Sequence, residues 1–262
     1  MQNPLATTSA REISAVPRLE PWREPGIVAG FLGRDGGVST GASASMNLSE
    51  LVGDDPAHLA ENWRRLRASL PPQMVFARLR QVHGNEVVVV TRANSGDRPR
   101  ADAMVTREAA IVLGIFTADC VPVLLSAPRE RVCGAMHAGW RGVIAGIAEA
   151  SVRAMDSLGA APGSIRAALG PSIGPCCFEV DRELADRFAS GIPGASRHRR
   201  EGRPGKAYLD LRAIVRDQLI AEGLAPDAIE NLGPCTRCAP DRYFSRRAAG
   251  GAVTGLQLSF VG

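Results

Sequence analysis

The chain has 262 residues, 45% of them apolar, and a formal net charge of +4 from 31 basic and 27 acidic side chains. This composition is typical of a globular protein with a full core, and it is too mildly basic to indicate a nucleic-acid-binding surface. No stretch approaches about 18 consecutive apolar residues, the length that spans a bilayer, and the N-terminus lacks the pattern of a secretory signal. We therefore expect a cytoplasmic protein that binds neither nucleic acid nor membrane.

The first fifth of the chain is predicted to be mostly irregular. Residues 1–25 contain four prolines and no apolar period, so we expect a loosely attached N-terminal arm, followed by a strand at 26–32. Residues 33–50 are rich in glycine and serine, which is typical of a loop that closely approaches a ligand or of a flexible surface loop. The sequence Asp54-Asp55-Pro56 then marks a helix start, and apolar residues recur at helical spacing until Pro71-Pro72.

The middle of the chain has the alternating and continuous apolar patterns of β-strands. Strands are predicted at 74–82, 86–90, 101–106, 111–117, 121–125 and 131–136. The run Val87–Val90 is continuously apolar, as in a strand that is covered on both faces. Residues 142–158 form the clearest amphipathic helix, which Gly159 ends.

The remaining elements complete a mixed pattern. Strands are predicted at 165–169, 229–232 and 256–261, helices at 181–189 and 210–222, and a solvated, arginine-rich loop at 192–206. Hairpin-like strand pairs and single helices do not alternate regularly, so the pattern favours an α/β fold of mixed sheets covered by helices over a Rossmann domain. We expect a single catalytic domain at residues 26–262.

Three reactive side chains follow predicted strands: His83, Cys120 and His137. If these strands lie side by side in one sheet, the three side chains converge at its edge. Two imidazoles and a thiolate form either a metal site with an open fourth position or a nucleophile with its base. The set fits zinc, and it also fits copper. The alternative is a structural role, as a hydrogen-bonded core histidine and a buried cysteine.

Neighbouring residues extend this candidate site. We expect Asp119 to accept a proton from a ligand imidazole, or to carry protons in the pocket. Arg141 stands at the predicted start of the helix at 142–158, where free N–H groups and the helix dipole favour an anion such as phosphate. Arg141, and Asn47 in the glycine- and serine-rich loop, are the expected substrate-binding residues.

The other cysteines indicate a second site only weakly. Cys235 and Cys238 have the spacing of a zinc knuckle or a redox pair, whereas the adjacent Cys176 and Cys177 fit the usual ligand spacing poorly. In a cytoplasmic chain these thiols should be reduced. We expect a structural or passive role for them.

A series of motifs resembles the laccase-domain family, also known as polyphenol oxidases. In chain order these motifs are GGVSTGASASMNL, QVHG, DAMVT, TADCVPVLL, HAGWRG, GPSIGPCCFEV, CTRC and YFSRR. Phe178 stands where the family usually has tyrosine. The resemblance implies a layered α/β/β/α fold and a zinc site at His83, Cys120 and His137. It also implies phosphorolysis of adenosine, inosine and methylthioadenosine, and deamination of adenosine.

Several functions remain open at this point. The leading hypothesis is a zinc-dependent purine nucleoside phosphorylase with adenosine deaminase activity, acting on purine nucleosides and phosphate. A copper-dependent polyphenol oxidase, an oxidoreductase, is the second, although four histidines are few for several copper ions. A third is a metal-free hydrolase in which Cys120 is the nucleophile and His137 its base. A scaffold protein without catalysis is the non-enzymatic alternative.

Overall fold

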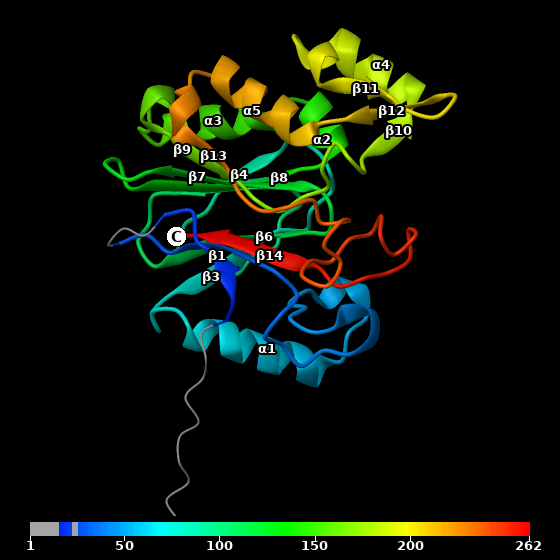
Figure 1. Cartoon of the computed structure of the whole chain (residues 1–262). Coiled ribbons are helices and arrows are strands. Elements are labelled where there is room, and N and C mark those ends of the chain that lie inside the picture. The colour runs from blue at the N-terminus through cyan, green and yellow to red at the C-terminus, as the bar shows by residue number, and fades with distance from the viewer. Residues whose placement is uncertain (1–15, 23–25) are drawn as a thin grey trace, which may run out of the picture.

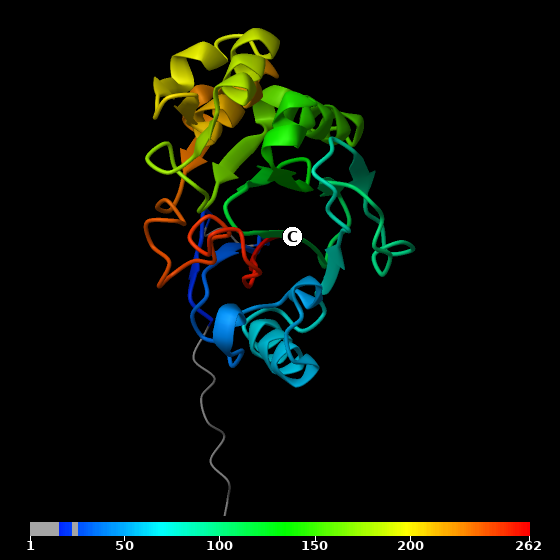
Figure 2. The ribbon, with the colours of Figure 1, turned by 90° about the vertical axis from the view of Figure 1, so that its right-hand side faces the viewer.

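The computed structural model describes residues 16–22 and 26–262. Two β-sheets lie against each other in the middle of the molecule, and helices cover both outer faces (Figure 1). Helix α1 lies on one side, and α3, α4 and α5 lie on the other (Figure 2). The predicted α/β class with layered, mixed sheets is confirmed.

The first sheet has five strands in the order β1-β2-β14-β6-β3. All its neighbours are antiparallel except β3, which runs parallel to β6. The strands are β1 (Arg18–Leu19), β2 (Ala29–Leu32), β14 (Gln257–Val261), β6 (Ile111–Thr117) and β3 (Val75–Arg78). The outer face packs on α1 (Pro56–Ala68), where Leu66 shares a buried cluster with Leu258 and Phe260. Helix α1 begins as predicted, since the side chain of Asp55 accepts a hydrogen bond from the backbone N–H of Ala57.

The second sheet has six strands in the order β13-β9-β7-β8-β5-β4. The pairs β13–β9 and β5–β4 are parallel and the others antiparallel. The strands are β13 (Ile229–Asn231), β9 (Arg166–Leu169), β7 (Val121–Ala127), β8 (Val132–Ala138), β5 (Ala103–Thr106) and β4 (Val87–Val89). Helices α3 (Ile147–Ser157) and α5 (Leu211–Ala221) cover the outer face.

Strand β7 is buried on both faces. Val123 and Leu125 belong to the cluster under the helices, whereas Leu124 packs with Leu113 and Ile115 of the other sheet. Alternate side chains of a strand point to opposite faces, so the apolar run of β7 supplies both cores.

Strand β4 does not match its prediction. It lies at the edge of the six-stranded sheet, and Val89 is 42% exposed. The prediction that Val87–Val90 is covered on both faces is therefore wrong for this strand, because continuous apolar sequence alone does not distinguish a central strand from an edge strand.

The predicted helix at 142–158 is divided in two. Helix α2 spans Trp140–Ile144 and α3 spans Ile147–Ser157. Between them Gly146 has a φ of 84°, a left-handed conformation that ends a helix and that glycine adopts at little cost. Arg141 consequently lies in a helix of five residues and not at the start of the long one.

Part of the predicted loop at 192–206 belongs to a small sheet. Its order is β10-β12-β11, with β10 (Glu179–Asp181), β12 (Lys206–Leu209) and β11 (Arg199–Glu201). It adjoins α4 (Arg182–Gly191), and Arg199 forms an ion pair of 2.5 Å with Asp186 of that helix. The strands are short and charged, so the apolar pattern does not predict them.

Part of the predicted N-terminal arm is packed in the fold. Strand β1 pairs with β2, and Val16 and Trp22 are buried. Residues 1–15 and 23–25 of the arm lie outside the described residues. Within the described part of the chain, no helix combines the length and apolar character needed to cross a membrane.

Candidate metal centre

His83, Cys120 and His137 come together at one end of the two sheets. Their potential ligand atoms all lie within 4.8 Å of one another. The Sγ atom of Cys120 is 3.9 Å from Nε2 of His83, and the centroids of the two imidazoles are 4.7 Å apart with nearly perpendicular rings. The three residues therefore have the spacing of a three-ligand metal site.

Two sheets, and not one, supply these residues. His83 follows β3 of the five-stranded sheet, and His137 lies within β8 of the six-stranded sheet. Cys120 ends the short turn by which the chain passes from β6 of the first sheet to β7 of the second. The prediction of a common sheet edge is wrong, and the site lies where the chain crosses between layers.

Asp102 connects the two histidine segments. His137 Nδ1 lies 2.8 Å from Oδ1 of Asp102, and the same carboxylate accepts hydrogen bonds from the backbone N–H groups of His83 at 2.8 Å and Gly84 at 2.6 Å. With its proton on Nδ1, the His137 ring leaves Nε2 free to bind a metal. The hydrogen bonds between Asp102 and the backbone of His83 and Gly84 hold His83 at a φ of 62°, a left-handed conformation that is uncommon for residues other than glycine.

The charges of the site favour a thiolate beside a charged imidazole when no metal is bound. Burial opposes ionisation of Cys120, but His137 and His83 outweigh it and lower the pKa of the thiol to about 6. Burial likewise opposes the charged form of His137, but Cys120 and Asp102 raise its pKa to about 9. Because a metal binds the neutral imidazole and the thiolate, binding would displace only the imidazole proton at neutral pH.

Glycine leaves room for these side chains. A Cβ atom at position 139 would lie 2.8 Å from Cδ2 of His83 and 3.4 Å from Sγ of Cys120. A Cβ atom at position 142 would lie 2.6 Å from the carbonyl oxygen of Gly84. Gly139 and Gly142 therefore allow the start of α2 to pack directly against the His83 segment.

Two cavities open onto the centre. One has a volume of about 370 Å³, and its lining includes Gln81, Arg98 and Phe116. The other has a volume of about 610 Å³, and its lining includes Trp140, Phe178 and Arg247. Both are within the size range of small-molecule sites. Four residues line both cavities: His83, Ala118, Cys120 and Arg246.

The family described as multi-copper polyphenol oxidoreductase laccase matches residues 28–262. The chain belongs to this family. It is 38% identical to "Purine nucleoside phosphorylase YlmD" of Geobacillus stearothermophilus over 90% of each chain. It is 41% identical to "Purine nucleoside phosphorylase SCO2081" of Streptomyces coelicolor, over 83% of this chain and 89% of that one. The crystal structure of YlmD superposes with a TM-score of 0.84 at 37% identity, covering 91% of this chain and 92% of that chain.

Asp119, in the family motif TADC, stabilises a turn. Its carboxylate accepts hydrogen bonds from the Thr236 hydroxyl at 2.6 Å and from the backbone N–H of Arg247 at 2.7 Å. Its carbonyl accepts one from Ile173 at 2.9 Å. Asp102, which the sequence alone did not single out, is the acceptor next to His137. The signal in the sequence is that Asp102 is a single acidic residue directly before the apolar strand of the DAMVT motif.

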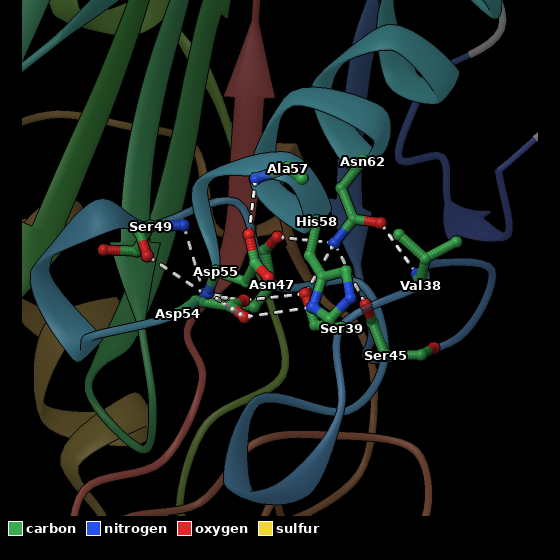
Figure 3. Close-up of polar contacts among 10 residues, drawn as sticks. All are labelled: Val38, Ser39, Ser45, Asn47, Ser49, Asp54, Asp55, Ala57, His58 and Asn62. Atoms are coloured by element: carbon green, nitrogen blue, oxygen red, sulfur yellow. Dashed lines mark hydrogen bonds and ion pairs between the residues drawn. The ribbon is translucent and has the colours of Figure 1, made fainter.

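Asn47 is buried within the glycine- and serine-rich loop (Figure 3). Its amide nitrogen donates to the Ser49 carbonyl at 3.0 Å and to Asp54 at 2.8 Å, and its oxygen accepts from the backbone N–H groups of Ser49 and Leu256. These four bonds use both donors and both lone pairs of the amide. Asn47 therefore holds Ser49 and Leu256, which line the smaller cavity, and its amide has no hydrogen-bonding capacity left for a substrate.

Arg141 lies outside the lining of both cavities. Its exposed guanidinium stacks on the ring of Trp140, 4.5 Å from the centroid. Arg246 of the YFSRR motif, by contrast, lines both cavities beside Cys120. Arginine at a cavity wall is suited to phosphate, and Arg246 was a member of a family motif to which the sequence alone assigned no role.

Proposed function

We propose that the protein is a purine nucleoside phosphorylase that uses zinc held by His83, Cys120 and His137. The observation that carries this proposal is the convergence of the three side chains at the wall of the smaller cavity, where His83 and Cys120 also line the larger one. Support also comes from two relatives named purine nucleoside phosphorylase, with 38% and 41% identity over most of the chain. Purine nucleosides and phosphate are the proposed substrates, in the cytoplasm.

The donor set fits zinc. Two imidazoles and a thiolate are common zinc ligands, and three protein ligands leave a fourth position for water or substrate. Asp102 orients His137 from behind, as an outer partner of a metal-bound imidazole does. Bound zinc would act as a Lewis acid and would lower the pKa of a coordinated water to about 7.

The residues around the centre would bind and orient the reactants. In phosphorolysis, phosphate attacks C1′ of the nucleoside and the purine leaves with the bonding electrons. Arg246, at the junction of the two cavities, would hold the phosphate close to the centre. Phe116 in the smaller cavity offers an aromatic face to the purine.

Deamination of adenosine is the second reaction in this proposal. It needs a hydroxide directed at C6 of adenine and a proton for the departing ammonia. Asp119 lines the larger cavity beside Cys120, so it is the carboxylate in place to pass that proton, although two hydrogen bonds to its oxygens hold its position.

Product analysis tests both reactions. Purified, zinc-loaded protein with adenosine and phosphate should yield adenine and ribose 1-phosphate, and without phosphate it should yield inosine. Inosine and methylthioadenosine should also be cleaved in phosphate. If a zinc-replete sample forms neither a free base nor inosine, the proposed function is wrong.

A metal-free hydrolase is the second candidate. The pKa of Cys120, lowered to about 6 beside His137, favours it because it makes a nucleophilic thiolate at neutral pH. Activity that survives complete metal removal and disappears on alkylation of Cys120 would favour this class. Copper-dependent oxidation of phenols has less support, because only two of the four histidines lie together among the residues described.

A further inference from the structure

A second cluster of metal-binding side chains lies outside the centre described above. The Sγ atoms of Cys176, Cys177, Cys235 and Cys238 all lie within 4.8 Å of one another. That of Cys238 is 3.6 Å from Cys176 and 3.4 Å from Cys177. In a tetrahedral site with zinc–sulfur bonds of about 2.3 Å, neighbouring sulfurs lie about 3.8 Å apart. The two distances from Cys238 are thus close to the tetrahedral value, and all four sulfurs are near enough to share one ion.

The sheet brings the two cysteine pairs together. Strands β9 and β13 are parallel neighbours, so the loops that follow them leave the same end of the sheet. The first loop carries Cys176 and Cys177, and the second carries Cys235 and Cys238. Ser172 and Cys235 form a β-bridge, and Thr236 donates its backbone N–H to the Ser172 carbonyl at 3.1 Å. The pairing of β9 and β13 thus brings Cys176 and Cys177 close to Cys235 and Cys238, although adjacent cysteines fit the usual ligand spacing poorly.

The surroundings suit negatively charged sulfur. The backbone N–H of Gly174 donates to Sγ of Cys235 at 3.2 Å, and the guanidinium of Arg237 donates to Sγ of Cys177 at 3.4 Å. Arg212 donates to the carbonyls of Gly233 at 3.0 Å and Ser172 at 3.3 Å, one in each cysteine loop. Four thiolates around a divalent ion carry a net charge of −2, and two arginines beside them offset it.

We propose that Cys176, Cys177, Cys235 and Cys238 bind a structural zinc ion, separate from the ion at His83, Cys120 and His137. Four protein ligands close the coordination sphere, so this site has no position for substrate. It stabilises the protein by joining two loops that the sheet alone only brings close.

The four-cysteine site also supports the metal centre. Thr236, between Cys235 and Cys238, donates to Asp119, the neighbour of Cys120, and Ile173 of the other loop donates to the Asp119 carbonyl. Loss of the ion would loosen the turn that presents Cys120. The second site is therefore a positioning element for the first.

Metal analysis of Cys120→Ser isolates the new site, because this substitution removes a ligand from the other centre. Purified under reducing conditions in zinc, Cys120→Ser should keep one zinc per chain, and Cys120→Ser/Cys238→Ser should keep none. Cys120→Ser/Cys133→Ser is the matched control and should keep one, since Cys133 belongs to neither cluster. These results do not depend on enzymatic activity, so they remain decisive if the proposed function fails.

Cobalt substitution of Cys120→Ser gives a readout that needs no second substitution. Cobalt bound by four thiolates has strong sulfur-to-metal charge-transfer absorption and tetrahedral visible bands, and zinc should abolish both by displacement. If Cys238→Ser fails to fold, Cys176→Ser, at an exposed thiol, replaces it. Absence of metal in Cys120→Ser, cobalt without thiolate absorption, or a disulfide among these four cysteines in the reduced preparation would overturn the proposal.

Discussion

Oδ1 of Asp102 lies 2.8 Å from Nδ1 of His137, and both side chains are buried. The same carboxylate binds the backbone that presents His83. Burial raises the pKa of Asp102, but hydrogen bonds from His137 and the backbone of Gly84 and His83 lower it below its usual value. One ionised residue thus sets the positions of two of the three proposed ligands.

Asp102→Asn tests this relationship. The amide removes the negative charge behind His137 and part of the acceptor capacity for the His83 segment, so zinc affinity should fall by about 10- to 100-fold. Competition with a chelator measures the affinity. Asp97→Asn, at an exposed aspartate, is the control and should bind zinc normally. Equal affinities in the two variants would show that Asp102 does not position the ligands.

The reactivity of Cys120 should follow its lowered pKa in the metal-free protein. Alkylation requires the thiolate, so its rate should rise with a midpoint near pH 6, and not near the ordinary cysteine value of 9. Because His137 contributes to the shift, His137→Ala should move the midpoint upward. Mass spectrometry of the labelled peptide measures the rate. Burial raises the pKa of Cys133 to about 11, so this internal control should stay unlabelled, and a wild-type midpoint near pH 9 would contradict the charge pairing.

Asn47→Ala should act on stability. Removing the amide takes one donor from the Asp54 carboxylate, which keeps the Ser39 hydroxyl, and takes the Asn47 acceptor from the backbone N–H groups of Ser49 and Leu256. Buried polar groups that lose their partner cost about 1–3 kcal/mol. Chemical denaturation measures the change in unfolding free energy, and the exposed Asn231→Ala is the control. If Asn47→Ala unfolds normally but raises the KM of the nucleoside, then Asn47 binds substrate as the sequence predicts.

Arg246 and Arg141 should differ in their effect on phosphate. Arg246→Ala should raise the KM for phosphate by about 10- to 100-fold, because a charge-assisted hydrogen bond contributes about 1.5–3 kcal/mol. Arg141→Ala, which removes a guanidinium outside both cavities, should change it less than threefold. Steady-state phosphorolysis at varied phosphate concentration gives both values. The reverse ranking would support the anion-binding role that the sequence predicts for Arg141.

Local signals in the sequence account for many of the elements. Asp55 and Pro56 mark the start of α1. Strands β6, β7 and β8 appear as apolar runs because each contributes to two buried clusters. The three proposed metal ligands were named from the sequence because each is a chemically distinctive residue beside a strand. Two histidines and one cysteine make a donor set typical of zinc, and the prediction rested on this set and not on the spacing of the three residues along the chain.

Other features depend on contacts that local patterns do not encode. The crossing of the chain from β6 to β7 decides which layer each ligand comes from, and it depends on sheet pairing across the whole fold. Asp102 is one polar residue whose role depends on two distant segments. The cysteine cluster joins loops that are about 60 residues apart along the chain and become neighbours only through β9 and β13.

Cys120→Ser tests whether the thiolate of Cys120 holds the metal that the two reactions need. Serine keeps the size of the side chain, but its hydroxyl stays protonated near neutral pH and binds zinc poorly. We predict that the variant loses the zinc bound with His83 and His137, and loses phosphorolysis and deamination with it, while its thermal stability falls only modestly. The measurement is zinc content and turnover of adenosine on the same sample. Full metal content with full activity in Cys120→Ser would contradict the assignment of the centre.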